Sequence, residues 1–536
     1  MRSLLMCLSI LLVLAAPPSL ALAQDELTGV APLPLTGERR AEFAAYVDAT
    51  LAMMGVPGAA VGVVQGNEIV YLDGFGVKEL GADSAVTPDT LMRVASVTKP
   101  VTTTMTATLV DDGRIGWDTP VVELLSGFAL ADPVLTQRLT VADLFCACSG
   151  VPNRDAELGF NSFALTPARL IAAARDFPLT APAGERYQYS NQMFSIGGYA
   201  AAAAAGGGPN TLYDAYTLAM RERVLTPIRM ERSTFSLADV LADGDYAISH
   251  IVNLAGETHP LALLEDQSIY TAEAPAGALW SSAREMARYV QTQLAGGLAP
   301  GGARVVFSEN LALTWEPRVA IPANPGGPPV LNEMLAGYGL GWFVGEYQGQ
   351  RVLSHGGTAF GFTSEIAFLP EADLGLVVLT NGPQVGTAYF FTQAIKVRLL
   401  ELLFDQPAEI DPFLPGLLDD LAADTAQILA RLGPVDPSSV APYLGRYSNP
   451  ALGEVVVALR GDRLLFDAGE LWFELRPLVG EEATYLFYDG PLGAFTDTVT
   501  FREGAVGQPS LVMAVTEAEA LTYTFESVAP VATPQP

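Results

Sequence analysis

The chain contains little cysteine, histidine or lysine: each occurs only three times among 536 residues. The histidines and cysteines are scattered, and their spacing matches no pattern by which these residues ligate zinc. The sequence therefore predicts no metal site and no cofactor. Only Cys146 and Cys148 lie beyond the N-terminal segment. Their C-x-C spacing places them poorly for a bridge to each other, and we expect both thiols to be small packing residues.

Positive charge is scarce as well. Lys and Arg together number 29 against 59 Asp and Glu, which gives a net charge of −30. A chain this acidic repels phosphate backbones and anionic lipid surfaces, so we expect no nucleic-acid partner and no anionic membrane partner. Beyond the N-terminus no apolar run is long enough to cross a bilayer, and the sequence predicts no membrane span.

Residues 1–23 have the features of a secretory signal. Arg2 precedes an apolar run over residues 4–16, and Ala-Leu-Ala at 21–23 offers a cleavage site after Ala23. The alternative is an N-terminal membrane anchor, which the shortness of the run and Pro17-Pro18 disfavour. We therefore expect an exported protein, secreted or periplasmic.

The region 24–405 mixes helix and strand patterns. It predicts a β-hairpin over 58–79 with its turn at 65–67, strands over 364–382, and helices over 97–112, 281–297 and 388–404. We expect the last of these helices, which carries Lys396, to lie at the surface. Strands from both ends of the region around a helical middle predict an antiparallel sheet with helices on its faces, an α/β (α+β) fold with an all-helical subdomain.

The rest of the chain has a different composition. Residues 406–440 are acidic and interrupted by prolines, and predict a linker with one helix at 415–431. Residues 441–530 alternate short apolar runs with Gly- and Asp-containing turns, which is typical of a small antiparallel barrel. Residues 531–536 are expected to form a frayed tail. Two or more domains are expected, because this length exceeds what one core supports.

One of the three lysines stands in the sequence Ser-Val-Thr-Lys at 96–99. On a helix, residues three apart share a face, so Ser96 Oγ and Lys99 Nζ can meet. Pro100 favours a position in the first helical turn, where the positive end of the helix dipole stabilises an alkoxide. A desolvated lysine can activate a serine nucleophile. The alternative is a helix-capping serine followed by a solvated lysine.

Two further motifs favour the catalytic interpretation. Tyr189-Ser190-Asn191 enters a second predicted helix, and His355-Gly356-Gly357 lies in a strand-like context. An S-x-x-K, a Y-x-N and a strand with a cation or histidine before glycine resemble the three motifs of the penicillin-recognising serine hydrolases. The resemblance is to the class C β-lactamase, D-aminopeptidase and esterase branch. It covers residues 36–405, where stretches such as "LTVADLFCACSGVP" and "YGLGWFV" are similar to family landmarks.

The resemblance implies a role for each motif residue. Ser96 would be the nucleophile, and Lys99 and Tyr189 would share general-base and general-acid duty. Asn191 would hydrogen-bond Lys99 and the acyl side of the substrate. The backbone N–H groups of Ser96 and Thr358 would form the oxyanion hole. Gly356 and Gly357 would let the substrate lie along the strand.

The third motif departs from the Lys-Thr-Gly of most β-lactamases. His355 is at best partly charged near pH 7 and Gly356 offers no hydroxyl, so recognition of a substrate carboxylate is weakened. The sequence favours a serine hydrolase of small ester, amide or peptide-like substrates. A β-lactamase or D-amino-acid peptidase is the first alternative, and a non-catalytic ligand-binding or sensor relative is the second. The C-terminal barrel resembles a lipocalin-like appendage, and the number of subunits stays open.

Overall fold

The computed structural model describes residues 27–160, 165–261, 271–383, 386–469, 471–491, 495–504, 508–516 and 520–528. The predicted signal segment 1–23 and the predicted tail 531–536 lie outside these ranges. Among the described residues, the helices are all too short or too polar to cross a membrane.

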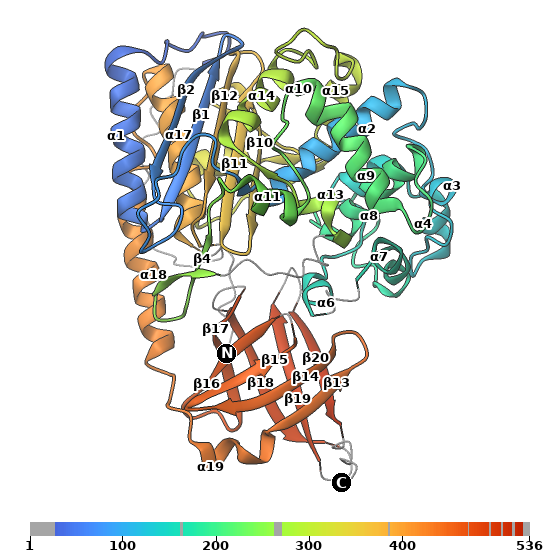
Figure 1. The fold of residues 1–536 in the computed structure, drawn as a ribbon, viewed down its shortest axis with the longest axis vertical. Coiled ribbons are helices and arrows are strands. Elements are labelled where there is room, and N and C mark those ends of the chain that lie inside the picture. Colours follow the sequence, from blue (N-terminus) through green and yellow to red (C-terminus); the bar gives the residue numbers. More distant parts are fainter. Residues whose placement is uncertain are drawn as a thin grey trace.

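An eight-stranded, fully antiparallel sheet organises the first part of the chain (Figure 1). The predicted hairpin forms one edge, and its inner strand pairs with a strand whose residues lie more than 300 positions later in the chain. The order across the sheet is β2 (Glu68–Gly76), β1 (Gly58–Gln65), β12 (Leu374–Thr380), β11 (Phe362–Leu369), β10 (Gln350–Ala359), β9 (Phe343–Tyr347), β8 (Gly337–Tyr338) and β7 (Val319–Ala320).

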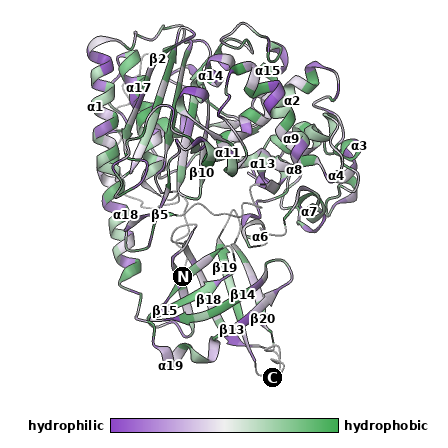
Figure 2. Ribbon diagram, viewed as in Figure 1, coloured by the Kyte–Doolittle hydropathy of each residue, from purple (hydrophilic) through white to green (hydrophobic). Residues whose placement is uncertain are grey.

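Helices cover both faces of this sheet. Along β1, Ala59 and Val61 pack with helices α1 (Gly37–Met54) and α17 (Thr387–Phe404), whereas Ala60 and Val64 pack into the core on the opposite face. This alternation is the period-two pattern of a strand buried on both faces. Figure 2 shows that α17, which packs beside α1 on this face of the sheet, is largely hydrophobic.

The core on the other face is built by α2 (Thr98–Asp111), α8 (Asn191–Ala204) and α14 (Ala283–Leu294). Shorter helices surround them: α3 (Val121–Leu124), α4 (Pro133–Arg138), α5 (Val141–Phe145), α6 (Asp155–Gly159), α7 (Pro167–Ala173), α9 (Leu212–Met220), α10 (Thr226–Ile228), α11 (Leu237–Asp243), α13 (Ala274–Gly277) and α15 (Ser308–Thr314). Helix α16 (Pro329–Met334) packs into the core on the other face, with α1 and α17. Two small sheets pair β3 (Met92–Arg93) with β6 (Trp280–Ser281), and β4 (Ser249–Val252) with β5 (Thr258–Leu261).

The second part is a closed antiparallel barrel of eight strands, β13 (Gly445–Asn449), β14 (Gly453–Arg460), β15 (Arg463–Asp467), β16 (Trp472–Pro477), β17 (Thr484–Asp489), β18 (Phe495–Glu503), β19 (Pro509–Thr516) and β20 (Ala520–Ser527). Its side chains alternate as expected: Val455 and Val457 are buried inside, while Val456 between them is exposed. Helices α18 (Leu414–Leu429) and α19 (Pro437–Val440) lead into it. The predicted fold class is confirmed, and the domain boundaries at 405 and 441 stay predictions.

The expectation that Lys396 lies at a surface is wrong. Its side chain and that of Glu365 on β11 are each 2 % exposed, and Lys396 Nζ lies 2.6 Å from Glu365 Oε1. Helix α17 is covered by α1 on one side and by the sheet on the other, so a lysine at this position requires a buried counter-ion.

Candidate active site

Ser96 lies in a 3₁₀ turn (Ala95–Val97) that leads directly into α2. Ala95, immediately before it, has a φ of 48°, in the left-handed region that residues with a Cβ seldom adopt. Such backbone strain persists only where the surroundings enforce it, and it gathers at functional sites. The turn leaves Ser96 partly accessible, while its neighbours Ala95 and Val97 are buried.

Lys99 lies one turn further and is completely buried. Its Nζ atom lies 3.0 Å from Ser96 Oγ, 2.6 Å from Asn191 Oδ1 and 2.9 Å from the carbonyl oxygen of Ala276. The last two atoms can only accept hydrogen bonds. A neutral lysine has two N–H donors and one lone pair, so these two acceptors direct the lone pair at Ser96 Oγ.

Burial lowers the pKa of Lys99 from 10.5 to about 7, because the charged amine loses its hydration. The negative charges of Glu273 and Asp155 act in the opposite direction and raise this pKa. Desolvation is the larger effect. Near neutral pH, therefore, a substantial fraction of Lys99 is neutral and able to accept a proton.

Asn191 is the first residue of α8, and Ser190 caps that helix through the N–H of Met193. The amide Nδ2 of Asn191 donates to both carboxylate oxygens of Asp155, each at 3.1 Å. A carboxylate accepts only, so this contact fixes which end of the Asn191 amide faces Asp155. The amide oxygen is thereby left to face Lys99.

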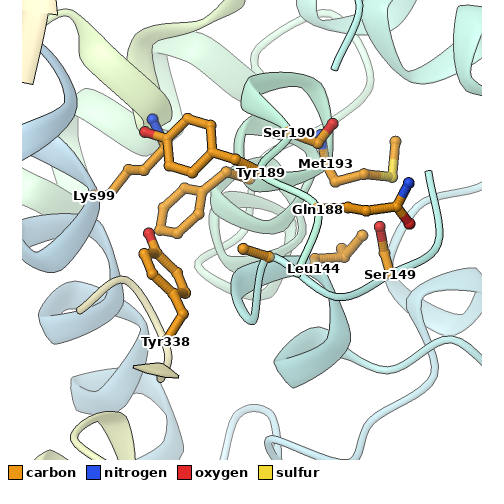
Figure 3. A pocket seen from close by; sticks show the side chains of 10 residues that line it. Lys99, Leu144, Ser149, Gln188, Tyr189, Ser190, Met193 and Tyr338 are labelled. Atoms are coloured by element: carbon orange, nitrogen blue, oxygen red, sulfur yellow. The ribbon is translucent and has the colours of Figure 1, made fainter. Parts of the chain in front are cut away.

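Tyr189 covers the other side of the lysine. The Lys99 Nζ atom lies 4.6 Å from the centre of the Tyr189 ring, and the Tyr189 side chain also lies beside Ser96. Burial raises the pKa of Tyr189 well above its usual range, so the phenol keeps its proton. Figure 3 shows Lys99, Tyr189 and Tyr338 at one end of a small pocket, with Ser149, Gln188 and Met193 at the other.

Strand β10 passes the serine so closely that only glycine fits at position 357. A Cβ atom there would lie 2.8 Å from the backbone nitrogen of Ser96 and 2.4 Å from the Val94 carbonyl oxygen. Thr358 follows on the same strand and pairs with Thr363 of β11. At Gly356 a Cβ would point to the other face of the sheet, 2.9 Å from Glu365 Oε2. Glycine at 356 thus makes room for the buried Lys396–Glu365 pair.

His355 is buried beside the tyrosines. Its Nε2 lies 2.9 Å from the Tyr338 hydroxyl, and its Nδ1 lies 2.6 Å from the carbonyl oxygen of Gly356. Burial, with a further effect of the nearby Lys99 charge, lowers the pKa of His355 to about 3. The ring is therefore neutral at physiological pH and supplies no fixed positive charge.

The structure thus brings together Ser96, Lys99, Tyr189, Asn191, His355 and Gly357, with Thr358 next along β10 and Gly356 turned to the other face. Three groups that act on Lys99 or on Asn191 were not predicted from the sequence: Asp155, Glu273 and the Ala276 carbonyl. Asp155 and Glu273 act through charge and hydrogen bonds and lie in no recognised motif. The Ala276 group belongs to the backbone, which any residue type would supply.

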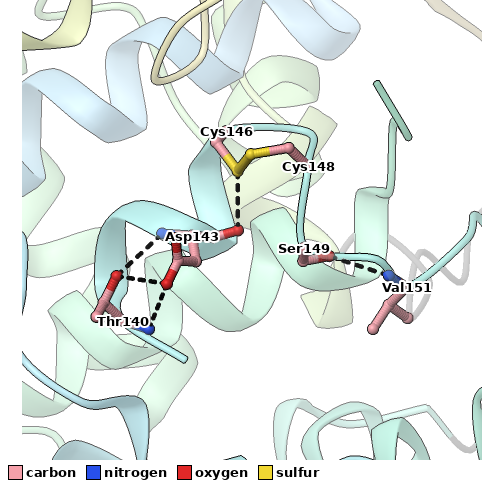
Figure 4. Close-up of a disulfide and its surroundings, with 6 residues drawn as sticks. All are labelled: Thr140, Asp143, Cys146, Cys148, Ser149 and Val151. Atoms are coloured by element: carbon pink, nitrogen blue, oxygen red, sulfur yellow. Dashed lines mark hydrogen bonds between the residues drawn. A yellow bond between two sulfur atoms is a disulfide. The ribbon is translucent and has the colours of Figure 1, made fainter. Parts of the chain in front are cut away.

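The expectation for the two cysteines is wrong: Cys146 and Cys148 form a disulfide (Figure 4). Ala147 between them has a φ of 51°, and this left-handed turn brings the two Cα atoms to 5.1 Å, within the normal range for a bridge. The same turn presents the Ala147 carbonyl oxygen to the backbone N–H of Gln188, next to Tyr189. The disulfide therefore closes the loop that supports the pocket.

Among the described residues, no three His, Cys, Asp or Glu side chains gather as a metal ion would require. The reacting groups that the structure does assemble are a serine, a buried lysine and a partly buried tyrosine.

The fold and this grouping are those of β-lactamase-type serine hydrolases. A sequence model described as Beta-lactamase matches residues 43–400, and the chain belongs to this family. It is 26% identical over 449 residues to unguisins hydrolase ungD' of Aspergillus campestris, covering 80% of this chain and 79% of that protein. It is 28% identical over 364 residues to penicillin-binding protein 4 of Amycolatopsis lactamdurans, covering 67% of this chain and 90% of that protein.

The fold similarity extends into the C-terminal barrel. The octameric penicillin-binding protein homologue from Pyrococcus abyssi superposes with a TM-score of 0.58, covering 91% of this chain and 99% of that one. At 21% sequence identity, this similarity speaks for the fold alone.

Proposed function

We propose that this protein is an exported serine hydrolase that forms an acyl-enzyme on Ser96 and acts on ester or peptide-like bonds. The observation that carries the proposal is the 3.0 Å contact between Ser96 Oγ and the Nζ of a fully buried lysine whose pKa is about 7. Export is proposed from the signal features of residues 1–23.

In the first step Ser96 Oγ attacks the carbonyl carbon of the substrate, and its proton passes to the lone pair of Lys99. The carbonyl oxygen becomes an oxyanion, which the backbone N–H groups of Ser96 and Thr358 stabilise. The close approach of Gly357 to the Ser96 nitrogen supports this placement of the two donors.

In the second step the tetrahedral intermediate expels the alcohol or amine. The leaving group takes a proton from the Tyr189 hydroxyl, which Lys99 re-protonates, and the acyl group stays on Ser96. A water molecule then attacks the acyl-enzyme and gives a proton to Lys99. When the bond between the acyl carbon and Ser96 Oγ breaks, the Tyr189 hydroxyl gives its proton to Ser96 Oγ, Lys99 re-protonates Tyr189, and the acid is released. Tyr189 suits this relay because it keeps its proton until a leaving group takes it.

The proposed substrate class is supported by His355. A β-lactam presents a carboxylate, and the neutral, buried His355 supplies no charge to hold it. A lost charge-assisted hydrogen bond costs about 1.5–3 kcal/mol, or roughly ten- to a hundredfold in rate. A short-chain ester needs only the nucleophile, the base and the oxyanion donors. A peptide-like substrate stays the second candidate, favoured by relatives that are named as an unguisins hydrolase and as a penicillin-binding protein.

The test compares p-nitrophenyl acetate with nitrocefin under identical conditions. We expect ester hydrolysis to have the higher kcat/KM, with nitrocefin turned over slowly or not at all, and Ser96→Ala to remove both activities. A higher kcat/KM for nitrocefin would show that the protein is a β-lactamase and that the argument from His355 fails.

A further inference from the structure

The C-terminal barrel contacts helix α6 of the catalytic region, and α6 is connected to Lys99 through Asn191. Helix α6 lies at the junction between the two parts of the molecule (Figure 1). Its first residue, Asp155, holds Asn191, and residues further along this helix contact the barrel. One short helix therefore links the barrel to the lysine.

The barrel contacts α6 and the residue after it through apolar packing and through a hydrogen bond. The Phe160 ring, just after α6, lies 5.9 Å from the ring of Phe466 and 6.2 Å from that of Phe473, both in the barrel core. The Tyr523 hydroxyl of β20 donates to Glu157 Oε1 at 3.1 Å. Leu471 of the barrel also packs against Gly159. Apolar packing and a hydrogen bond together hold the end of α6 against the barrel.

The interior of the barrel is occupied by its own aromatic side chains. Phe466, Phe473, Phe487 and Phe525 are buried and pack ring against ring, and Phe160 of the catalytic region joins this cluster. The barrel is thus built as a packed support for the segment that it touches.

The active-site side of the link is a chain of hydrogen bonds. Asn153 Nδ2 donates to Asp155 Oδ2 at 2.6 Å, and Asn191 Nδ2 donates to both oxygens of the same carboxylate. If Asp155 moved away, the Asn191 amide could rotate and turn its donor end toward Lys99. The lysine would then lose one of the two acceptors that direct its lone pair at Ser96.

We propose that the barrel is a positioning element of the active site: it anchors α6 so that Asp155 fixes the orientation of the Asn191 amide, which in turn orients Lys99. Asp155 is a positioning residue, since it acts through Asn191. The kinetic test of this proposal rests on the proposed function, because it uses Lys99 as the proton acceptor.

The groups that bear on the charge of Lys99 come from four elements. Asp155 of α6 and Glu273 before α13 raise its pKa, while His355 of β10 and Tyr189 before α8 are neutral near pH 7. Loss or displacement of Asp155 therefore lowers the pKa of Lys99 and moves the acid limb of kcat/KM to lower pH. General destabilisation of the protein would reduce the active fraction without that displacement.

The experiment measures ester kcat, KM and the pH profile of the full chain for Asp155→Ala, Phe160→Ala and the double variant. We expect Asp155→Ala to lower kcat by about tenfold, as for the loss of a charged hydrogen bond, with the acid limb displaced to lower pH. Phe160→Ala should also lower kcat and displace the acid limb to lower pH, but both changes should be smaller than in Asp155→Ala. Phe160→Leu, which refills the apolar contact, should recover most of the loss.

The double variant gives the decisive comparison, because two changes that act through one route do not add. We expect it to match Asp155→Ala alone. Two results would overturn the role of the barrel. One is a double variant whose loss of kcat is the product of the two single losses. The other is a Phe160→Ala enzyme with the kcat and the acid limb of the wild type. An unchanged Asp155→Ala enzyme would overturn the role of Asp155.

Phe160→Ala should remain folded, since the barrel also contacts the catalytic region through Leu254 N–H to the Tyr488 carbonyl oxygen and through His259 and Asp489. If it does not fold, Tyr523→Phe takes its place, with the same expected result. Its matched control is Tyr447→Phe, which removes a hydroxyl that bonds within the barrel, to the Tyr443 carbonyl oxygen. Absence of fluorophosphonate labelling at Ser96 in the wild type would instead refute the proposed function.

Discussion

The Nζ atom of Lys99 lies 2.6 Å from the amide oxygen of Asn191, although 92 residues separate the two in the chain. The contact joins the first turns of α2 and α8, and it leaves Ser96 Oγ as the neighbour toward which the lysine lone pair points. The proposed chemistry depends on this arrangement, because a buried amine acts as a base only when it is neutral and correctly directed.

The first prediction concerns Lys99 itself. Lys99→Arg keeps a positive charge but places a guanidinium that does not lose its proton at this position. We expect kcat for ester hydrolysis to fall by about two orders of magnitude or more, as for the removal of a general base. The matched control is Lys78→Arg, because Lys78 forms a partly exposed ion pair with Asp245 and should tolerate the change. An active Lys99→Arg enzyme would mean that another group accepts the serine proton.

The second prediction is the pH profile of kcat/KM. Below its pKa of about 7, Lys99 is protonated and cannot accept the serine proton, so activity should fall as the pH falls below 7. Above that pH the profile should level off, since the pKa of Tyr189 is raised well above its usual range and that of His355, about 3, lies far below. A limb centred instead near pH 4, about where carboxylic acids titrate, would identify a carboxylate as the base.

The third prediction concerns the buried pair beneath β10. Lys396→Met leaves the Glu365 carboxylate without its counter-ion in a site that is almost fully enclosed, which should cost about 3–5 kcal/mol of stability. Urea or thermal unfolding measures this loss. Lys78→Met is the matched control, and the loss of its partly exposed pair with Asp245 should cost about 0–1 kcal/mol. Replacing both partners, with Lys396→Met and Glu365→Leu, should recover much of the stability; a near-neutral single variant would contradict the burial.

The motif residues could be located from the sequence because their chemistry requires particular side chains at particular spacings. Ser96 and Lys99 share a helical face, and the glycine at 357 is required where β10 passes the Ser96 nitrogen. The hairpin turn at 65–67 and helix α14, with its Ser282 cap, also lie close to their predicted positions, because turn and cap signals are local.

What the sequence did not reveal depends on three-dimensional context. Asp155 matters only because α6 places it against Asn191, and no local pattern marks that placement. The Cys146–Cys148 bridge depends on the left-handed φ of Ala147, which C-x-C spacing does not specify. The sequence did contain a pattern that indicates the burial of Lys396. Helix α17 is apolar on nearly all sides, which is the pattern of a buried helix, and its lysine therefore called for a partner.

The central claim is that Ser96 is the nucleophile, and covalent labelling tests it most directly. The full-length protein is treated with a fluorophosphonate probe, digested, and the modified residue located by peptide mass spectrometry. We predict a single adduct, on the peptide that contains Ser96, and its loss in Ser96→Ala. An adduct on Ser149, Ser195 or Ser354, or undiminished labelling of Ser96→Ala, would contradict the account.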